Sequence, residues 1–501
     1  MMTKTVRRLA ASAALSLTLL AFPKLGFSQR VEDSCHAFFE DRHQALDCLE
    51  ALFTEKDIPY HLPHLTMSSI PPANGFPIGV VWEKRTYNVS PFANTSADSG
   101  SAPTNDSNAF KSLSDLTAAI VISTNSSWYA TGAFSWLPPL HYRDDFRNTE
   151  GMRKSCHRLG PICTEQVFGI NLSLTHRTLQ TLYFYGLGPA SPITQFTFRQ
   201  TETYGGADAR MPLLDWLTIE GQIGNTKPDI QFSTASLASN AISEKTAPGV
   251  VSQPDFMHYA VGLRTQVQAI AEPKTDDPAV TPPGVTPPPL MKHKLVFIFQ
   301  NNVLQHWYSD QDTGHYSFRQ LEIVGNEVIR LHSVIRRFVP PDKMTKALAI
   351  LKHFCNSRAS GLKVHDECDF GELTFSPFLV STTATEGTGV APFYFQPTLG
   401  GSDIESRPTL RGFNDYRFRA PDAAMIGVEY GMPVYNPIGA LVFYEAGTVG
   451  NTIGDLSFAH ARQDAGYGIS LRLLKTVIAE AYLGYGAGHG AHFGYNFTKF
   501  F

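Results

Sequence analysis

Apolar and polar residues alternate along much of the chain after residue 76. Between residues 168 and 175, large apolar residues hold every even position, and glycine or polar residues hold every odd one. The same period recurs at residues 217–223 and 259–269. Successive side chains of a strand point to opposite faces, so this period predicts strands with one apolar and one polar face. A soluble β-sandwich alternates in the same way, so the period alone leaves two fold classes open.

The number and length of these segments favour a membrane barrel. Most of them are about 9–12 residues long, close to what a tilted strand needs to cross a bilayer. We therefore expect an all-β fold, a 16-stranded antiparallel transmembrane β-barrel. The sixteen predicted strands are residues 77–87, 113–124, 127–137, 166–176, 179–187, 193–204, 213–224, 256–271, 292–303, 314–329, 369–382, 422–433, 438–448, 465–473, 476–486 and 491–501.

The connections between the predicted strands alternate in length, as short turns and long loops do at the two ends of an outer-membrane barrel. The short turns are Asn125-Ser126, Arg177-Thr178, Asn436-Pro437 and Lys475-Thr476. The long outer loops are residues 88–112, 138–165, 225–255, 383–421 and 449–464. Two connections break the rule: the Pro-rich stretch 272–291 and the insertion 330–368 both fall on the side of the short turns. Either they are insertions there, or the strand count is wrong by a hairpin.

The N-terminus reads as a secretory signal peptide over residues 1–28. A basic start precedes an apolar run of about 14 residues, which is shorter than the ~20 residues of a membrane span. Residues 29–76 are then expected to form a short periplasmic segment, helical at first and extended after Pro59. Residues 77–501 form the barrel domain.

Charge and hydropathy further limit how the protein can reside in a membrane and what it can bind. No later segment approaches about 18 uninterrupted apolar residues, so membrane residence must come from strands. Cleavage after Ser28 reduces the 41 basic residues to 37, against 45 acidic ones. A net negative chain without clustered cations argues against nucleic acid as a partner.

Six cysteines lie as three pairs of near neighbours in the sequence. An even count in an exported chain suggests disulfides, and local pairing is the simplest connectivity. A metal site is the alternative, but no Cys-x-x-Cys motif occurs and the pairs are far apart. The expected disulfides are Cys35 with Cys48, Cys156 with Cys163, and Cys355 with Cys368.

The C-terminal 120 residues contain an ordered series of motifs. They are Pro392-Phe393 to Leu399-Gly400-Gly401, Leu410-Arg411-Gly412-Phe413, Arg417-Phe418-Arg419, Glu429-Tyr430-Gly431-Met432-Pro433, Phe443-Tyr444-Glu445-Ala446-Gly447, Gly466-Tyr467-Gly468 with Leu471-Arg472, and the terminal aromatic strand. In order and spacing, this region resembles the last six strands of the bacterial surface antigen superfamily. Those outer-membrane barrels include BamA, TamA and the two-partner-secretion transporters.

The resemblance implies a plug loop between the eleventh and twelfth strands, folded back into the lumen. The plug-loop motif is Leu410, Arg411, Gly412 and Phe413. Its arginine is expected to pair with acidic side chains on the inner wall, which match Glu429 and Glu445 here. Alternation supports Glu429, because Val428 and Tyr430 share the opposite face. The family usually has aspartate where Glu445 stands.

The last strand carries a second implied role. Its aromatic residues face one way and would suit lipid and the interface. The resemblance implies that this strand is the C-terminal insertion signal read by the outer-membrane assembly machinery. Its residues are Phe493, Tyr495, Phe497 and Phe501.

Other chemistry has little support in the sequence. Serine-hydrolase, zinc-protease and phosphate-loop motifs are absent, so no catalytic residue is expected and no enzyme activity. His61 with His64 and His489 with His492 have ligand-like spacing, but in a strand each pair points to opposite faces. We expect no metal and no cofactor.

The resemblance implies a role in outer-membrane protein insertion or translocation, in a Gram-negative type of bacterium. The expected partners are outer-membrane lipid, the assembly machinery and unknown client proteins. Residues 29–76 are too few for the periplasmic POTRA domains of the family's assembly members, so client capture is in doubt. A passive pore or structural surface barrel is the alternative, and a hydrolase is a third possibility without motif support.

Overall fold

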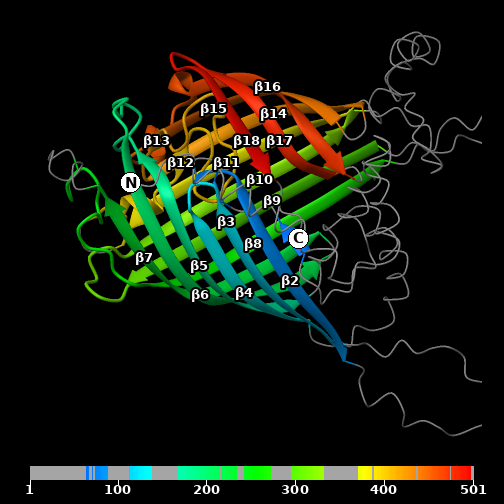
Figure 1. The fold of residues 1–501 in the computed structure, drawn as a ribbon, viewed down its shortest axis with the longest axis horizontal. Coiled ribbons are helices and arrows are strands. Elements are labelled where there is room, and N and C mark those ends of the chain that lie inside the picture. Colours follow the sequence, from blue (N-terminus) through cyan, green and yellow to red (C-terminus); the bar gives the residue numbers. More distant parts are fainter. Residues whose placement is uncertain are drawn as a thin grey trace, which may run out of the picture.

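In the described residues of the computed structural model, most of the chain belongs to one large antiparallel sheet. It describes residues 64–66, 70, 71, 74–88, 112–137, 168–214, 216–233, 242–271, 295–331, 371–385, 389–435, 438–473 and 476–497. The strands lie side by side in a curved wall that surrounds an interior (Figure 1). Within the described residues, no helix is long and apolar enough to cross a membrane.

Among the described residues, the large sheet contains 16 strands, in the order β1 to β11 followed by β14 to β18. They are β1 (His64–Thr66), β2 (Pro77–Asn88), β3 (Ser112–Ser123), β4 (Trp128–Leu137), β5 (Gly169–Phe184), β6 (Phe196–Leu214), β7 (Leu217–Phe232), β8 (Phe256–Ala271), β9 (Leu295–Asp310), β10 (Phe318–Arg330), β11 (Glu372–Ala384), β14 (Asp422–Tyr435), β15 (Ile438–Gly450), β16 (Arg462–Leu473), β17 (Thr476–Gly486) and β18 (Gly490–Phe497). A separate two-stranded sheet pairs β12 (Thr398–Leu399) with β13 (Phe418–Arg419). The all-β prediction is confirmed.

One predicted turn is wrong. Arg177 and Thr178 lie inside β5, a single strand of 16 residues, so two predicted strands are one. Arg177 points inward and forms an ion pair with Glu202 at 2.7 Å, and Thr178 on the other face contacts Thr201 of β6. β1 has only three residues, too few for an alternating pattern to reveal it. It pairs with β2 and restores the number of strands to sixteen.

This correction changes which connections share an end of the sheet. Following the strands in order, residues 88–112 and 138–165 join strands at the same end as the short connections after β14 and β16. The connection from β11 to β14, residues 385–421, lies at the other end, which we call the plug end. The segments 272–291 and 330–368 share the first end with 88–112 and 138–165, whereas the predicted long loops 225–255, 383–421 and 449–464 fall at the plug end. Short and long connections therefore occur at both ends, and the predicted separation of short turns from long loops is wrong.

The two faces of the sheet differ sharply in composition. Large apolar side chains that alternate along the strands point outward and are exposed, for example Ile122, Leu174, Val261 and Ile469 at 55–62%. Their neighbours in sequence point inward and include buried polar residues such as Glu220 and His258. This is the reverse of a soluble sandwich, whose apolar face is the buried one.

The edges of the sheet approach each other through aromatic rings. The ring centroid of Phe76, just before β2, lies 5.0 Å from that of Phe497 and 6.5 Å from that of Tyr495. In the part of the chain that the structure describes, no strand pairing joins β18 to β1, which are the two ends of the strand order. A hydrogen-bonded, closed cylinder therefore stays a prediction.

Candidate functional site: the loop inside the sheet

The connection from β11 to β14 turns into the interior of the sheet instead of extending away from it. It contains the 3₁₀ helix η7 (Phe393–Phe395) and the β12–β13 pair. A further backbone hydrogen bond from Gly400 N to Thr409 O holds the two arms of the loop together. In Figure 1, β12 and β13 lie between the β5–β7 side and the β14–β15 side of the wall.

Apolar contacts fill the interior at the plug end. Phe393, Tyr394 and Tyr416 of the loop pack in one cluster with inward side chains of β5, β6 and β7. Leu399, Leu410, Phe413 and Phe418 pack in a second cluster with β11, β14 and β15. Phe413 and Leu410 are 1% and 0% exposed, which a surface loop would not show. The loop occupies the interior as a packed body.

The guanidinium of Arg411 is fixed between two carboxylates of the wall. Its Nε donates to Oε1 of Glu445 at 2.8 Å, and its Nη1 donates to Oε2 of Glu429 at 2.6 Å. The backbone N–H of Arg411 donates to the other oxygen of Glu445 at 2.7 Å. The structure thus brings together the three residues that the sequence motifs single out. We call this group the Arg411 clamp.

The guanidinium of the clamp is buried and lies against an aromatic ring. The Arg411 side chain is 5% exposed, and its guanidinium carbon lies 3.7 Å from the centroid of the Phe443 ring. Burial lowers the pKa of Arg411, but Glu445 and Glu429 raise it by more, so its pKa lies above the usual value. A guanidinium cannot lose its charge in such a place, and the carboxylates and the ring compensate for its lost water.

Gly412 lets the loop backbone touch the wall. Its N–H donates to Oδ2 of Asp464 on β16 at 2.6 Å. A Cβ at Gly412 would lie 2.6 Å from the backbone N of Gly486, and one at Gly484 would lie 2.7 Å from the carbonyl oxygen of Arg411. Both glycines are needed because two backbones approach closely here.

A second arginine attaches the loop to another part of the wall, at β10, which is two strands away from β14 in the sheet order. Arg407 pairs with Glu322 of β10 and, through its Nε, with Asp403 of its own loop at 2.7 Å. Glu322 in turn lies 3.6 Å from Nε2 of His306, whose Nδ1 shares a hydrogen bond of 2.9 Å with Nε2 of His258. We call the pairing of Arg407 with Glu322 and Asp403 the Arg407 bridge.

Two further arginines of the loop are buried without a carboxylate partner among the described residues. Arg417 donates to the hydroxyl and the carbonyl oxygen of Ser191. Arg419, 1% exposed, donates to the carbonyl oxygens of Phe393 and Gln396. Burial lowers the pKa of both, to about 10 for Arg419, which still leaves them charged at neutral pH.

The terminal strand takes the orientation that alternation predicts. Phe493 is 66% exposed, whereas Nδ1 of His492 is 3.1 Å from the carbonyl oxygen of Arg411. Tyr495 and Phe497 contact Phe76 at the edge of the sheet. Phe501, the six cysteines and the signal peptide lie outside the described residues. Nothing is described of His61, and the part of the chain that is described contains no cluster of three His, Cys, Asp or Glu side chains that could hold a metal ion.

Sequence reasoning missed Asp464, Arg407 and Glu322. Alternation could have found Asp464, because it shares the inward face of β16 with Gly466 and Gly468, opposite the exposed Tyr467. No comparable signal points to Arg407, because an irregular loop has no sequence periodicity from which its path could be predicted.

Together, the fold and the site define an all-β sheet protein whose interior holds a long loop, fixed to the wall by a buried arginine clamp. No family model and no curated protein sequence matches the chain.

Solved structures similar to this chain are BamA and CdiB barrels. BamA from Haemophilus ducreyi lacking POTRA domains 1–3 has 9% identity and a TM-score of 0.42, covering 86% of this chain and 69% of that one. CdiB from Acinetobacter baumannii has 8% identity and a TM-score of 0.39, covering 85% and 55%. CdiB from Escherichia coli has 9% identity and a TM-score of 0.39, covering 85% and 58%. The chain thus spans little more than half of each CdiB chain. At these scores the likeness assigns it neither a family nor a function.

Proposed function

We propose that this chain is an outer-membrane β-barrel of the surface antigen type, whose interior is plugged by residues 385–421. Its role would be to insert proteins into the outer membrane or to translocate them across it. The observation that supports this proposal most is the Arg411 clamp. A buried cation held by two carboxylates of the wall gives the loop one defined docked state, which suits a gate better than an ordinary surface loop.

The outer face of the sheet supports residence in a membrane. Large apolar side chains are exposed on consecutive strands, whereas soluble proteins rarely expose extended apolar surfaces. Aromatic side chains are exposed near both ends of the strands, as at membrane interfaces. At the plug end these are Tyr259, Trp307 and Tyr485, and at the other end Trp136 and Trp216. Signal peptide, disulfides and the insertion signal ending at Phe501 belong to the same proposal.

The mechanism follows from where the loop is attached. With both arginines paired, the loop fills the plug end and closes a path through the interior. Release of the Arg411 clamp would expose the inward carboxylates Glu429, Glu445 and Asp464 and would open that path. The seam between the three-residue β1 and the short β18 offers an edge on which a client strand could pair. No step in this sequence requires a catalytic residue or a cofactor.

A passive pore is the competing function, and conductance separates the two. Purified protein in a planar lipid bilayer should give small, flickering currents, because the docked loop blocks the interior. Arg411→Ala should give larger and longer openings. The control is Arg199→Gln, which removes a β6 guanidinium that donates to Gln231 and forms no hydrogen bond or ion pair with the described residues of the loop. A large, steady current from the unmodified protein would contradict the plug.

The assembly role needs a cellular test. Deleting the gene in its own bacterium should lower the amounts of other outer-membrane proteins, and restoring the wild-type gene should recover them. Restoring Arg411→Ala should recover them only in part. Unchanged levels after deletion would reject an assembly role while leaving the plugged barrel intact. Removing Phe501 should lower the amount of this protein itself in the outer membrane.

A further inference from the structure

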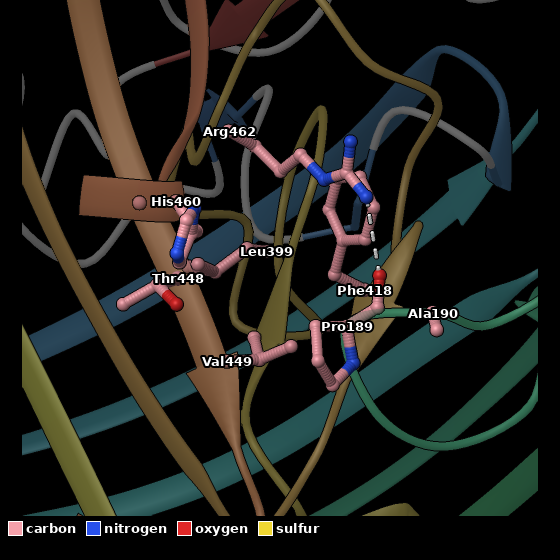
Figure 2. Close-up of a pocket in the computed structure, with 9 residues that line it drawn as sticks. Pro189, Ala190, Leu399, Phe418, Thr448, Val449, His460 and Arg462 are labelled. Carbon is pink, nitrogen blue, oxygen red and sulfur yellow. Dashed lines mark hydrogen bonds between the residues drawn. The ribbon is translucent and has the colours of Figure 1, made fainter. Parts of the chain in front are cut away.

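A cavity of about 210 Å³ lies at the plug end, where the loop meets the wall. The loop contributes Leu399 and Phe418, and the wall contributes Val449 at the end of β15. Figure 2 shows Arg462 and His460 in the upper part of the view, with Val449 and Pro189 below them. The lining residues are Pro189, Ala190, Leu399, Phe418, Gly447, Thr448, Val449, His460 and Arg462. None of them is acidic.

The rim of this cavity is basic and lacks a counter-charge. Arg462 donates from Nη2 to the carbonyl oxygen of Pro189 at 3.3 Å (Figure 2). Its guanidinium carbon lies 5.5 Å from the centroid of the Phe418 ring. No carboxylate of the described residues lies within ion-pair distance of Arg462. A carbonyl oxygen and a ring face satisfy only part of what a guanidinium can bind, because it has five N–H donors.

Further basic groups surround the same ring. The guanidinium carbon of Arg417 lies 4.8 Å from the Phe418 centroid, and the ring of His489 lies 6.3 Å from it. Arg417 is 4% exposed, and its Nε has no hydrogen-bond partner. Arg462 and His460 thus line the cavity, and Arg417 and His489 contact the ring of its lining residue Phe418. None of the four has a described carboxylate among its partners. Such a place favours an anion over a cation or a neutral molecule.

We propose that this cavity binds a small organic carboxylate, with its apolar body against Leu399, Phe418 and Val449 and its carboxylate on Arg462 and His460. An apolar pocket with a few convergent polar groups is the usual form of a small-molecule site. The cavity volume suits a compact body such as a phenyl ring or a short acyl chain.

The ligand would also act on the loop, and this consequence rests on the proposed plug. Two lining residues belong to the loop, and the other seven belong to the wall or to its connections. A ligand that contacts both binds the docked loop better than the released one, so it stabilises the docked state by linkage. The site would thus hold the plug closed when the carboxylate is abundant.

Calorimetric titration of the full chain in a non-ionic detergent tests binding, with phenylacetate as the probe. Phenylacetate should bind saturably, and the uncharged phenylacetamide should bind about tenfold more weakly or not at all. Arg462→Gln should lower the affinity for phenylacetate by about tenfold. Arg199→Gln, the same charge change away from the cavity, should leave it unchanged. Ala190→Phe, at an exposed lining position, should abolish binding by filling the cavity.

Three results would overturn the site: no saturable binding of phenylacetate, equal binding of phenylacetamide, or full affinity in Arg462→Gln. A variant that fails to fold would show equal gel mobility with and without heating. If Arg462→Gln fails in this way, the loss of binding in Ala190→Phe serves as the test of the site. Protection of the loop from protease by phenylacetate tests the linkage separately. Binding without protection would leave the carboxylate site standing and would count against the plug.

Discussion

The loop inside the sheet is attached to the wall at two places, β14–β15 and β10, by arginines whose surroundings differ. In the Arg411 clamp, the arginine and Glu445 side chains are 5% and 4% exposed. In the Arg407 bridge, the arginine side chain is 35% exposed and Glu322 is 21% exposed. Both arginines contact two carboxylates, so the number of ion pairs does not distinguish them.

The difference between the two attachments is the water that surrounds each charge. Breaking a buried ion pair leaves an uncompensated charge that solvent cannot reach, which costs about 3–5 kcal/mol. Breaking a partly exposed pair costs about 0–1 kcal/mol, because water replaces the partner. We therefore expect the Arg411 clamp to set the stability of the docked loop and the Arg407 bridge to adjust it.

Removing the clamp should have the largest effect. Arg411→Met keeps much of the side-chain volume but leaves Glu445 buried without its cation. The docked loop should lose about 3 kcal/mol, so cleavage within residues 389–421 by an added protease should accelerate about a hundredfold. The sheet should remain folded, as seen by unchanged gel mobility without heating. Cleavage at the wild-type rate would contradict the lumenal placement.

The two carboxylates of the clamp should differ in the same way. Glu445→Gln removes a charge from a side chain that is 4% exposed, whereas Glu429 is 25% exposed. We expect Glu445→Gln to cost about 2 kcal/mol and Glu429→Gln about 1 kcal/mol or less. Proteolysis rates of the two variants, measured side by side, give the comparison. Equal rates would show that burial does not rank these contacts.

Removing the Arg407 bridge should have a smaller effect. Arg407→Met should cost about 0.5–1 kcal/mol, a few-fold change in cleavage rate. Its effect should shrink as salt is raised, because exposed charges are screened more than buried ones. An effect of Arg407→Met as large as that of Arg411→Met, or one independent of salt, would remove the distinction between the two attachments.

Acid should loosen the loop slightly through His489. Its ring packs on Phe413 at 5.0 Å between centroids, and burial, then Arg417 and Arg462, lower its pKa below the usual 6.5. The neutral ring is thus favoured in the docked state. Its contribution is full above pH 6.5 and is lost as the pH falls through the lowered pKa. Cleavage should therefore accelerate in acid, and less so in His489→Gln. An identical acid response in that variant would exclude His489 as the cause.

Much of this architecture is readable in the sequence, because alternation and the C-terminal motifs are local signals. The strands from β14 to β18 and the facing of Glu429 follow from them directly. The turn at Arg177-Thr178 fails for an instructive reason. Arg177 suggests a turn only if an inward polar face is ignored, and here the interior supplies Glu202 as its partner. The three-residue β1 is too short to show any period.

The site was predictable only where a motif fixes the loop. Arg411, Glu429 and Glu445 come together as expected, while Arg407 and Glu322 could not be paired from sequence. Their meeting depends on the path of the loop between Ser402 and Pro408, where Asp403 accepts hydrogen bonds from the backbone of Glu405 and Arg407. Such turns are set by individual contacts and leave no period in the chain.

Hydrogen exchange of the loop amides in lipid nanodiscs tests the central claim most directly. The backbone N–H of Arg411 and that of Gly412 donate to Glu445 and Asp464 of the wall. Both amides should exchange far more slowly than in an unstructured peptide, and Arg411→Met should speed them without affecting the amides of β15. Exchange of these two amides at the rate of a free peptide in the unmodified protein would contradict the docked loop.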